Sequence, residues 1–293
     1  MKKSRFINYK TFIHVFFILY ALLCIVPFLL VVSISFSSEY DVVNYGFSLI
    51  PKHFDLSAYK QIFKAPDTLV NGYLVTLFSA FGGTTLNILS VSMAGYAISR
   101  DTCAFKKPFT IYMLITMFVH GGLIPGYIID TTVFHLGDNI LYYLINGMAG
   151  AYQIFVFRTF FSGIPKSLIE SAQLDGATEL QMLFKITIPL SKPVIATFTF
   201  TGILGRWNDY SLCMYYMTDP KNYNLQYMLQ QILNEAQFLK MLKDTMPALE
   251  DVVVPSETLK FAMCVLAAGP MVALFPFFQK YFAKGMVVGA VKG

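Results

Sequence analysis

Long apolar stretches alternate with polar segments along this chain, and each stretch is about as long as a membrane crossing. A helix needs about 20 mainly apolar residues to cross the roughly 30 Å hydrocarbon core of a bilayer. The stretches without Asp, Glu, Lys or Arg are 11–38, 68–99, 108–129, 139–157 and 261–279. A further stretch, 194–217, contains only Arg206 and Asp209 as ionised residues. The pattern therefore predicts an all-α membrane protein with six transmembrane helices.

The composition indicates the same class of protein. The 293 residues are 56% apolar and 13% charged, with a mean hydropathy of +0.57, whereas a soluble domain has about 25% charged residues. The net charge of +5 does not indicate nucleic-acid binding, because the basic residues are distributed among the segments between the spans. We expect a lipid bilayer and no nucleic acid among the partners.

The basic residues also predict the orientation. The first stretch follows four basic residues, as a signal peptide does, but its apolar run is too long and no A-x-A cleavage site follows, so we interpret it as an uncleaved span. With the N-terminus inside, fourteen of the 22 Lys and Arg residues fall in inner segments and seven in outer ones, which agrees with the positive-inside rule. Both termini and the loop 158–193 are then cytoplasmic. The long outer segments are 39–67 and 218–259.

The loop 158–193 has strong helix signals and seven charges. Ser167 with Glu170, and Thr178 with Gln181, have the spacing of capping boxes. A glycine between the two predicted short helices supplies a left-handed position that ends the first. Two prolines, Pro189 and Pro193, end the second. These signals alone are equally compatible with a hairpin lying flat on the membrane surface.

The residue spacing in this loop resembles the EAA loop of ABC-importer permeases, whose pattern is roughly E-A-A-x-x-D-G-A followed by I-x-x-P. The matching positions are Glu170, Ala172, Asp175, Gly176, Ala177, Ile186 and Pro189. Ser171 departs from the pattern by replacing the middle alanine with another small residue. The resemblance implies a cytoplasmic coupling helix that sits in a groove of an ATP-hydrolysing subunit. Glu170 would pair with a basic group of that subunit, and Gly176 would allow the bend. We call residues 158–193 the EAA loop.

The resemblance covers nearly the whole chain. Six spans with the EAA loop between the fourth and fifth are similar to the smaller permease of the maltose importer and its carbohydrate-uptake relatives, which have the type I (MetI-like) ABC importer permease fold. Segment 121–125, the pair Trp207-Asn208 and the C-terminal end are similar to a branch that serves complex oligosaccharides, some containing uronates.

The same resemblance implies a domain organisation. Residues 1–67 hold the first span and an outer segment, 68–284 form the permease core, and 285–293 form a cytoplasmic tail. The tail would contact the ATPase through Gly289, Lys292 and Gly293, although taken alone it also reads as a frayed basic terminus near anionic lipid. The outer loop 218–259 contains apolar residues at helical spacing, and by resemblance it would contact a solute-binding protein.

Arg206 and Asp209 are the ionised residues within a predicted span. Each costs about 2.5–3.5 kcal/mol at a lipid-facing helix centre, so we expect them to face the bundle or a watery cavity. At i, i+3 spacing they share a helix face. Two interpretations stay open: a structural ion pair, or the wall of a substrate pathway that also includes Trp207, Asn208 and Tyr210.

The energy source is expected in another chain, because no G-x-x-x-x-G-K-[ST] phosphate-binding motif occurs. The lead hypothesis is a non-catalytic permease that binds no cofactor. It would work with a homologous second permease, two ATPase subunits carrying ATP and Mg, and a solute-binding protein that delivers an oligosaccharide. The four cysteines and four histidines show no metal-ligand spacing. The alternatives are an ion-coupled secondary transporter, a membrane enzyme, for which no catalytic constellation is visible, and an ABC permease for a non-sugar solute.

Overall fold

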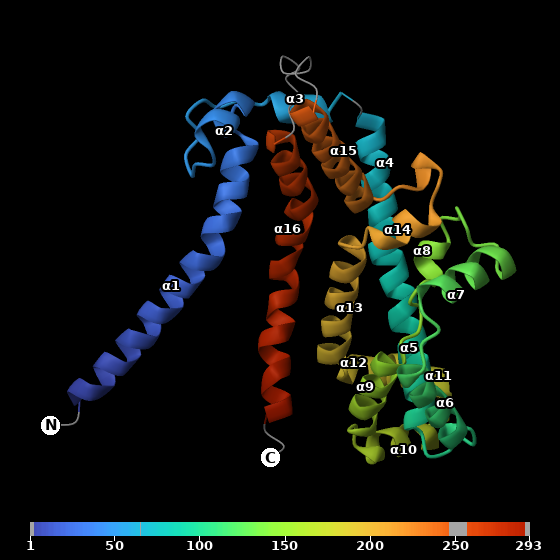
Figure 1. The fold of residues 1–293 in the computed structure, drawn as a ribbon. Helices are drawn as coiled ribbons and strands as arrows, with labels where there is room; N and C mark the ends of the chain where they lie inside the picture. The colour runs from blue at the N-terminus through green and yellow to red at the C-terminus, as the bar shows by residue number, and fades with distance from the viewer. Residues whose placement is uncertain (1–2, 65, 246–256, 291–293) are drawn as a thin grey trace. The chain divides into compact units, whose positions relative to one another are not determined.

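A computed structural model describes residues 3–64, 66–245 and 257–290 of the chain, and the described residues are almost entirely helical (Figure 1). They contain a single isolated bridge, between Ser37 and Phe54, and no β-strand. The α-helices are α1 (Lys3–Ser35), α2 (Glu39–Tyr45), α3 (Ser57–Ile62), α4 (Pro66–Leu77), α5 (Thr84–Ser99), α6 (Lys106–Phe118), α7 (Leu123–Ile128), α8 (Tyr142–Ile145), α9 (Ala151–Ser162), α10 (Lys166–Leu174), α11 (Glu179–Met182), α12 (Ile188–Leu190), α13 (Lys192–Trp207), α14 (Ser211–Tyr216), α15 (Leu225–Thr245) and α16 (Glu257–Ala290). The π-helical turns are η1 (Phe78–Gly83), η2 (Ile129–Val133) and η3 (Leu183–Thr187), and η4 (Pro220–Asn222) is a 3₁₀ turn.

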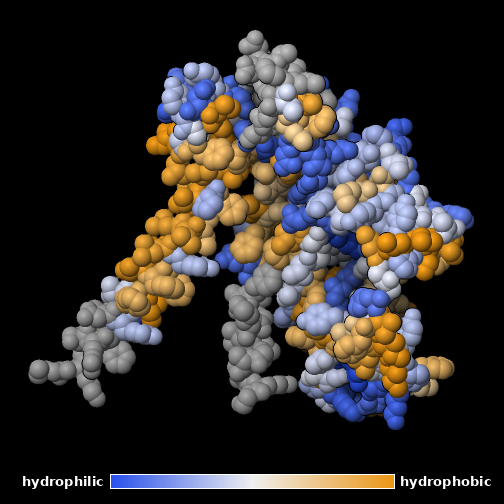
Figure 2. Space-filling model, viewed as in Figure 1, coloured by the Kyte–Doolittle hydropathy of each residue, from blue (hydrophilic) through white to orange (hydrophobic). Residues whose placement is uncertain are grey.

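Three of the predicted spans are long helices. Tyr9–Ser35 in α1, Pro66–Ser99 through α4, η1 and α5, and Glu257–Gln279 in α16 are long and apolar enough to cross a membrane. The first, second and sixth predicted spans are therefore confirmed as helices of membrane length. From Tyr9 onward, apolar side chains follow α1 (Figure 2), as expected for a helix whose surroundings are hydrocarbon or another apolar helix.

The third, fourth and fifth predicted spans are each interrupted, so each is built from two helices in place of one. In the third, α6 ends at Phe118 and the chain bends by 117° into α7 and η2. Gly122, with φ +86°, makes the turn possible because it has no Cβ. The fourth breaks between α8 and α9. The fifth begins after an 84° bend between Glu179–Leu190 and α13, which ends at Trp207. Each bent pair is apolar enough, taken together, to count as one span.

The described chain divides into two compact units. The first contains residues 1–69 and 229–270. Within it, the Glu39 carboxylate accepts hydrogen bonds from the backbone N–H groups of Glu257 and Thr258 and from the Thr258 hydroxyl. A carboxylate at this position satisfies free N–H groups at the start of α16 and is favoured by the helix dipole. The α2 segment therefore fixes the beginning of the last long helix.

The second unit contains residues 70–228 and 271–293, and α5 is its central helix. Gly95 of α5 lies so close to α9 that a Cβ there would be 2.9 Å from the Cβ of Phe157. The core of buried residues around this contact consists of Val91, Tyr96, Ile98, Ile154, Phe157, Phe161, Ile169, Met182, Leu183 and Val194. Four of them, Phe161, Ile169, Met182 and Leu183, belong to the EAA loop. The EAA loop is therefore packed directly onto α5 and α9.

Three glycines of the second unit lie where helices or turns approach closely. A Cβ on Gly82 would be 2.8 Å from the Leu144 side chain, and one on Gly202 would be 3.0 Å from Thr84. Gly83 is closer still to its neighbours, whereas a Cβ on Gly205 would meet no atom within 4 Å. Gly82, Gly83 and Gly202 therefore allow close packing, whereas Gly205 is not needed for it.

The outer loop and the tail are more helical than predicted. The helix expected in 218–259 is confirmed as α15, and α16 continues without a break to Ala290. The expected tail 285–293 therefore begins as helix, with Gly289 inside it. Lys292 and Gly293 lie outside the described residues. The division at residues 67/68 and 284/285 stays a prediction.

Candidate functional site

The turn between α10 and α11 explains the spacing of the motif residues in the EAA loop. The N–H of Gly176 donates to the carbonyl of Gln173 (3.0 Å), and the N–H of Ala177 donates to the carbonyl of Ala172 (2.9 Å). Gly176 has φ +77°. These two bonds and the left-handed residue form a Schellman motif, which satisfies the free carbonyls at a helix end. The predicted glycine reversal is confirmed.

The second arm of the EAA loop begins with a capping box. The Thr178 N–H donates to the Gln181 side chain (2.9 Å), and the Gln181 N–H donates to the Thr178 hydroxyl (3.3 Å). The helix then runs through η3 and α12 and ends at Leu190, directly after Pro189. The Thr178 box is therefore confirmed, but the Ser167–Glu170 box is wrong. Because α10 already begins at Lys166 after Pro165, Ser167 lies inside the first turn.

The motif residues separate into an inner and an outer set. Ala172, Ala177 and Ile186 pack against the core of the second unit. Glu170 and Asp175 are exposed. The exposed surface also carries apolar side chains, and the most exposed is Leu174 at 90%. Such a mixture of carboxylates and apolar side chains suits a protein partner better than lipid.

Several apolar side chains of the loop face outward. Leu168 is exposed, whereas its neighbour Ile169 is buried. Leu180 and Phe184 are likewise exposed, whereas Leu183 is buried. The helices α10 and α11 are short, with 9 and 4 residues. Only one face of each packs on the core.

Polar contacts attach the second arm to the end of α5. The Tyr96 hydroxyl donates to the Glu179 carboxylate (2.5 Å), and the Arg100 Nε lies 3.4 Å from the same oxygen, Oε2. Glu179 is the first residue of α11. Any displacement of α11 therefore acts on α5 through a charged hydrogen bond.

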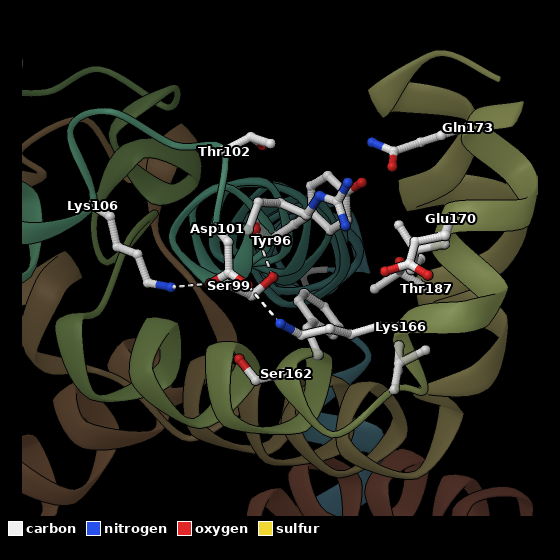
Figure 3. Close-up of a pocket in the computed structure, with 14 residues that line it drawn as sticks. Tyr96, Ser99, Asp101, Thr102, Lys106, Ser162, Lys166, Glu170, Gln173 and Thr187 are labelled. Atoms are coloured by element: carbon white, nitrogen blue, oxygen red, sulfur yellow. Dashed lines mark hydrogen bonds and ion pairs between the residues drawn. The ribbon is translucent and has the colours of Figure 1, made fainter. Parts of the chain in front are cut away.

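The first arm is attached to the same end of α5 by Asp101. Its carboxylate accepts from Lys106 of α6 (3.1 Å) and Lys166 of α10 (2.8 Å) (Figure 3). The hydrogen bonds from Lys166 and Lys106 lower the pKa of Asp101 to about 2, and Asp101 raises the pKa of Lys166. The bridge is therefore ionised at physiological pH.

These contacts surround a polar cavity of about 300 Å³. Glu170 and Gln173 line it from α10, and Ser99 and Asp101 line it from the end of α5 and the following loop (Figure 3). Sequence reasoning did not find Tyr96, Arg100 or Asp101, because no local motif includes them. Tyr96 and Glu179 are 83 positions apart, and only the fold brings them together.

Removing the Glu179 carboxylate should weaken the link between α11 and α5. We expect Glu179→Ala to lower ATP-driven uptake up to about tenfold, because a hydrogen bond to a charged group contributes about 1.5–3 kcal/mol and Glu179 is half exposed. Glu179→Gln keeps an acceptor for Tyr96 and should retain most of the uptake. The measurement is uptake in reconstituted vesicles. Equal rates for both variants would contradict a role for the Tyr96–Glu179 hydrogen bond in linking α11 to α5.

The residues predicted to line a substrate pathway are not grouped as expected. Arg206 donates to the carbonyls of Tyr143 and Asn146, at 2.6 Å each. Asp209 accepts from the Ser211 N–H and hydroxyl and from the Leu212 N–H, so it caps the start of α14. Because α13 ends at Trp207, Asp209 lies beyond the helix. The expectation that Arg206 and Asp209 share a helix face is wrong, and they form no direct ion pair within the described part of the chain.

The three remaining pathway candidates differ in exposure. Trp207 is only 1% exposed, and its ring lies beside Tyr73, with 6.5 Å between the ring centroids. Its ring therefore reaches no open cavity in this structure. Asn208 and Tyr210 are exposed. Their role in a pathway stays a prediction. The described residues contain no cluster of His, Cys, Asp and Glu that could hold a metal ion, and the four cysteines are free thiols.

The fold and the EAA loop define a class, that of helical multi-pass membrane proteins with an exposed, two-armed loop attached to a central span. The family model described as binding-protein-dependent transport system inner membrane component matches residues 104–288. The chain belongs to this family, the permease subunits of ABC importers in the bacterial inner membrane. Its members are non-catalytic membrane subunits that work with a second permease, an ATPase and a solute-binding protein. The secondary-transporter and membrane-enzyme alternatives are therefore not supported.

Relatives match over nearly the whole chain. The chain is 33% identical over 286 residues to the polygalacturonan/rhamnogalacturonan transport system permease protein YtcP of Bacillus subtilis, covering 96% of this chain and 97% of that one. It is 34% identical over 269 residues to protein LplC of the same organism, covering 92% and 90%. Its fold is similar to a crystal structure of a bacterial ABC transporter involved in the import of the acidic polysaccharide alginate, with a TM-score of 0.81, 27% identity, and coverage of 96% and 98%.

Proposed function

We propose that the EAA loop couples a partner ATPase to the spans of this permease and that the cargo is an oligosaccharide, including acidic ones. The observation that carries the coupling is the division of the loop into two sets of residues. Glu170, which lines the polar cavity, and Asp175 are exposed, while Ala172, Ala177 and Ile186 hold the loop on the core. A partner that binds Glu170 and Asp175 therefore moves α5 and α9 as well.

The chemistry of the outer surface suits docking in a groove of another protein. Glu170 lies on α10 and forms no direct ion pair with a described residue, so its charge is available to a basic group of the ATPase. Leu174 and Leu180 are exposed beside the turn and bring the apolar area that a buried interface core needs.

The cargo proposal rests on similar proteins. A relative at 33% identity is named as a permease of a polygalacturonan/rhamnogalacturonan transport system, and a structural neighbour takes part in alginate import. All three polymers contain uronic acids. We propose that this chain serves uronate-containing oligosaccharides, delivered by a solute-binding protein that contacts the outer loop 218–259.

The arrangement in the membrane follows from the proposal. Both termini and the EAA loop face the cytoplasm, where two ATPase subunits supply ATP hydrolysis with Mg, and this chain binds no cofactor. A homologous permease completes the membrane part. The C-terminal residues Gly289, Lys292 and Gly293 contact the ATPase. The basic residues concentrated on the inner side support this orientation.

The coupling proposal is tested by removing one carboxylate. We expect Glu170→Ala to reduce ATP-driven uptake at least tenfold, because loss of a charged partner at a buried interface costs about 2–5 kcal/mol. Ser171→Ala is the matched control, since the neighbouring exposed residue then takes the alanine of the family pattern, and it should transport normally. Crosslinking of a cysteine at Asp175 to the ATPase gives an independent readout. Normal uptake by Glu170→Ala would overturn the proposal.

A further inference from the structure

The break between α8 and α9 is an unusual feature for a membrane segment. Residues 146–150, Asn-Gly-Met-Ala-Gly, are non-helical although the surrounding stretch 139–157 has no charged residue. Gly147 has φ +66°, which other residues rarely adopt. We call residues 146–150 the α8–α9 break.

Two polar side chains from other helices hold this break. Arg206 of α13 donates to the carbonyl of Asn146 and to that of Tyr143 just before it. Asn87 of α5, only 5% exposed, donates to the carbonyl of Gly147 (2.9 Å) and to the side chain of Gln153 (2.8 Å), with a weaker contact to the carbonyl of Met148. Non-helical backbone within a bilayer persists only where such partners satisfy it.

The depth of the break follows from three helices. Their ends beside the EAA loop are Ser99 of α5, Ser162 of α9 and Lys192 of α13. At 1.5 Å per residue, Asn87 lies about 18 Å from Ser99 along α5, and Gly150 lies about 18 Å from Ser162 along the axis of α9. Arg206 lies about 21 Å from Lys192 along α13. The hydrocarbon core is roughly 30 Å thick. All three estimates therefore place the break inside the membrane.

The exposed surface beside the break is polar. Residues 146–149 are exposed, and so are Thr201, Gly205 and Asn208, which are spaced i, i+4, i+7 on α13. Two contacts place α13 beside the break. Arg206 donates to the Asn146 carbonyl, and the Phe198 ring of α13 lies beside the Tyr152 ring of α9, with 6.4 Å between the ring centroids. Exposed polar backbone and side chains at this depth are not tolerated against lipid. They require water, substrate or another protein.

We infer that the α8–α9 break and the α13 face of Thr201, Gly205 and Asn208 form a wall of the translocation pathway, where amide and hydroxyl groups bond the hydroxyl groups of a passing oligosaccharide. Arg206 and Asn87 are positioning residues that hold the break in place. This inference rests on the proposed function. It assigns a contact site to the backbone of the break, whereas Trp207 is enclosed and Arg206 points into the protein.

The occupant of this surface is expected to be the sugar for a chemical reason. A helix–helix interface in a membrane is built from small and apolar side chains, whereas this face has side-chain amides at Asn146 and Asn208 and a hydroxyl at Thr201. Each of these groups already donates one hydrogen bond within the chain, to the Tyr142 hydroxyl, the Leu204 carbonyl and the Thr197 carbonyl respectively. The oxygen of each can still accept a hydrogen bond from a sugar hydroxyl. Tyr152, exposed on the first turn of α9, adds an aromatic ring beside the break. Rings of this kind are the usual apolar surface for the faces of sugar rings.

Cysteine accessibility tests the inference in the complete reconstituted complex. The four native cysteines are replaced by serine, and Ala149→Cys and Thr201→Cys are introduced separately. A charged methanethiosulfonate reagent should modify both during ATP turnover, and oligogalacturonate supplied with the solute-binding protein should slow the modification several-fold. Leu23→Cys, in the apolar first span and 72% exposed, is the control and should stay unmodified.

The result that overturns the inference is a lack of modification at both positions in every nucleotide state, which would mean that the second permease or lipid covers this face. Modification that is equally fast with and without the sugar would also overturn it. Uptake and ATP hydrolysis stimulated by the binding protein are measured in the same vesicles. Normal ATP-driven uptake with negative labelling rejects the inference alone, whereas uptake independent of ATP rejects the proposed function.

The positioning role of Arg206 has its own readout. In the Ala149→Cys background, Arg206→Gln should remove the protection by oligogalacturonate, because the break loses the guanidinium donor that holds its Asn146 carbonyl. Arg206→Lys keeps a cation and should restore part of the protection. Equal protection in both variants would show that Arg206 does not position the break.

Discussion

Replacing Gly176 by proline should abolish ATP-driven uptake, whereas replacing it by asparagine should preserve most of it. At φ +77°, proline is excluded because its ring fixes φ near −65°, and it also removes the N–H that donates to Gln173. The combined loss is about 3 kcal/mol or more at one turn. The two arms of the EAA loop would then lose their relative orientation, and the ATPase would no longer move both. Uptake in reconstituted vesicles with the partner subunits gives the measurement.

The position offers an internal control for side-chain size. A Cβ on Gly176 would meet no atom within 4 Å, so only the backbone angle restricts the residue. Asparagine enters the left-handed region more readily than other residues, while alanine pays roughly 1–2 kcal/mol. The expected order of uptake is glycine, asparagine, alanine, proline. An order that follows side-chain volume instead would mean that the exposed surface at Gly176, and not the turn, is what the partner requires.

A methyl group at Gly83 should disrupt the centre of the second unit. In Gly83→Ala the new Cβ would lie 2.8 Å from the carbonyl oxygen of Tyr143 and closer still to the guanidinium of Arg206. The Tyr143 carbonyl belongs to the backbone and cannot rotate away from the new methyl group. The steric clash is therefore removed only if the Arg206 side chain leaves its hydrogen bonds to Tyr143 and Asn146. Unpaired groups of this kind cost about 1–3 kcal/mol each, and more when a charge is involved. We expect a lower melting temperature of the purified complex and a loss of uptake.

Gly126→Ala is the matched control for that experiment. Gly126 also lies in a helix of the second unit, and a Cβ there would meet no atom within 4 Å. This variant should melt and transport like the unmodified protein. Equal behaviour of the two variants would mean that Arg206 accommodates the methyl group at little cost, which would remove the steric reason for a glycine at position 83.

Sequence reasoning succeeded where the structure depends on neighbouring residues. The Schellman turn at Gly176 and the capping box of Thr178 are local, because their hydrogen bonds join residues three to five positions apart. The three uninterrupted spans were also predictable, since length and apolar content decide them. The failed Ser167 box shows the limit of this reasoning: the capping spacing was present, but α10 began at Lys166.

The candidate site was only partly predictable for the same reason. The exposed carboxylates Glu170 and Asp175 belong to a contiguous motif that can be read along the chain. The residues that attach the motif to the spans, Tyr96 and Asp101, come from a distant segment and have no signal of their own. Arg206 was correctly singled out as an ionised residue in a span, but its partners are backbone carbonyls, which carry no sequence signature.

The amino-acid sequence by itself determined the helical membrane class, the position of the EAA loop and the chemistry of its turn, because these follow from apolar run length and from short-range hydrogen bonding. The tertiary structure alone decided where the third, fourth and fifth spans break and what holds the broken ends. The physical reason is that a break within a membrane depends on whether distant side chains satisfy its carbonyls. Here Arg206 does so across 63 and 60 positions and Asn87 across 60 and 61.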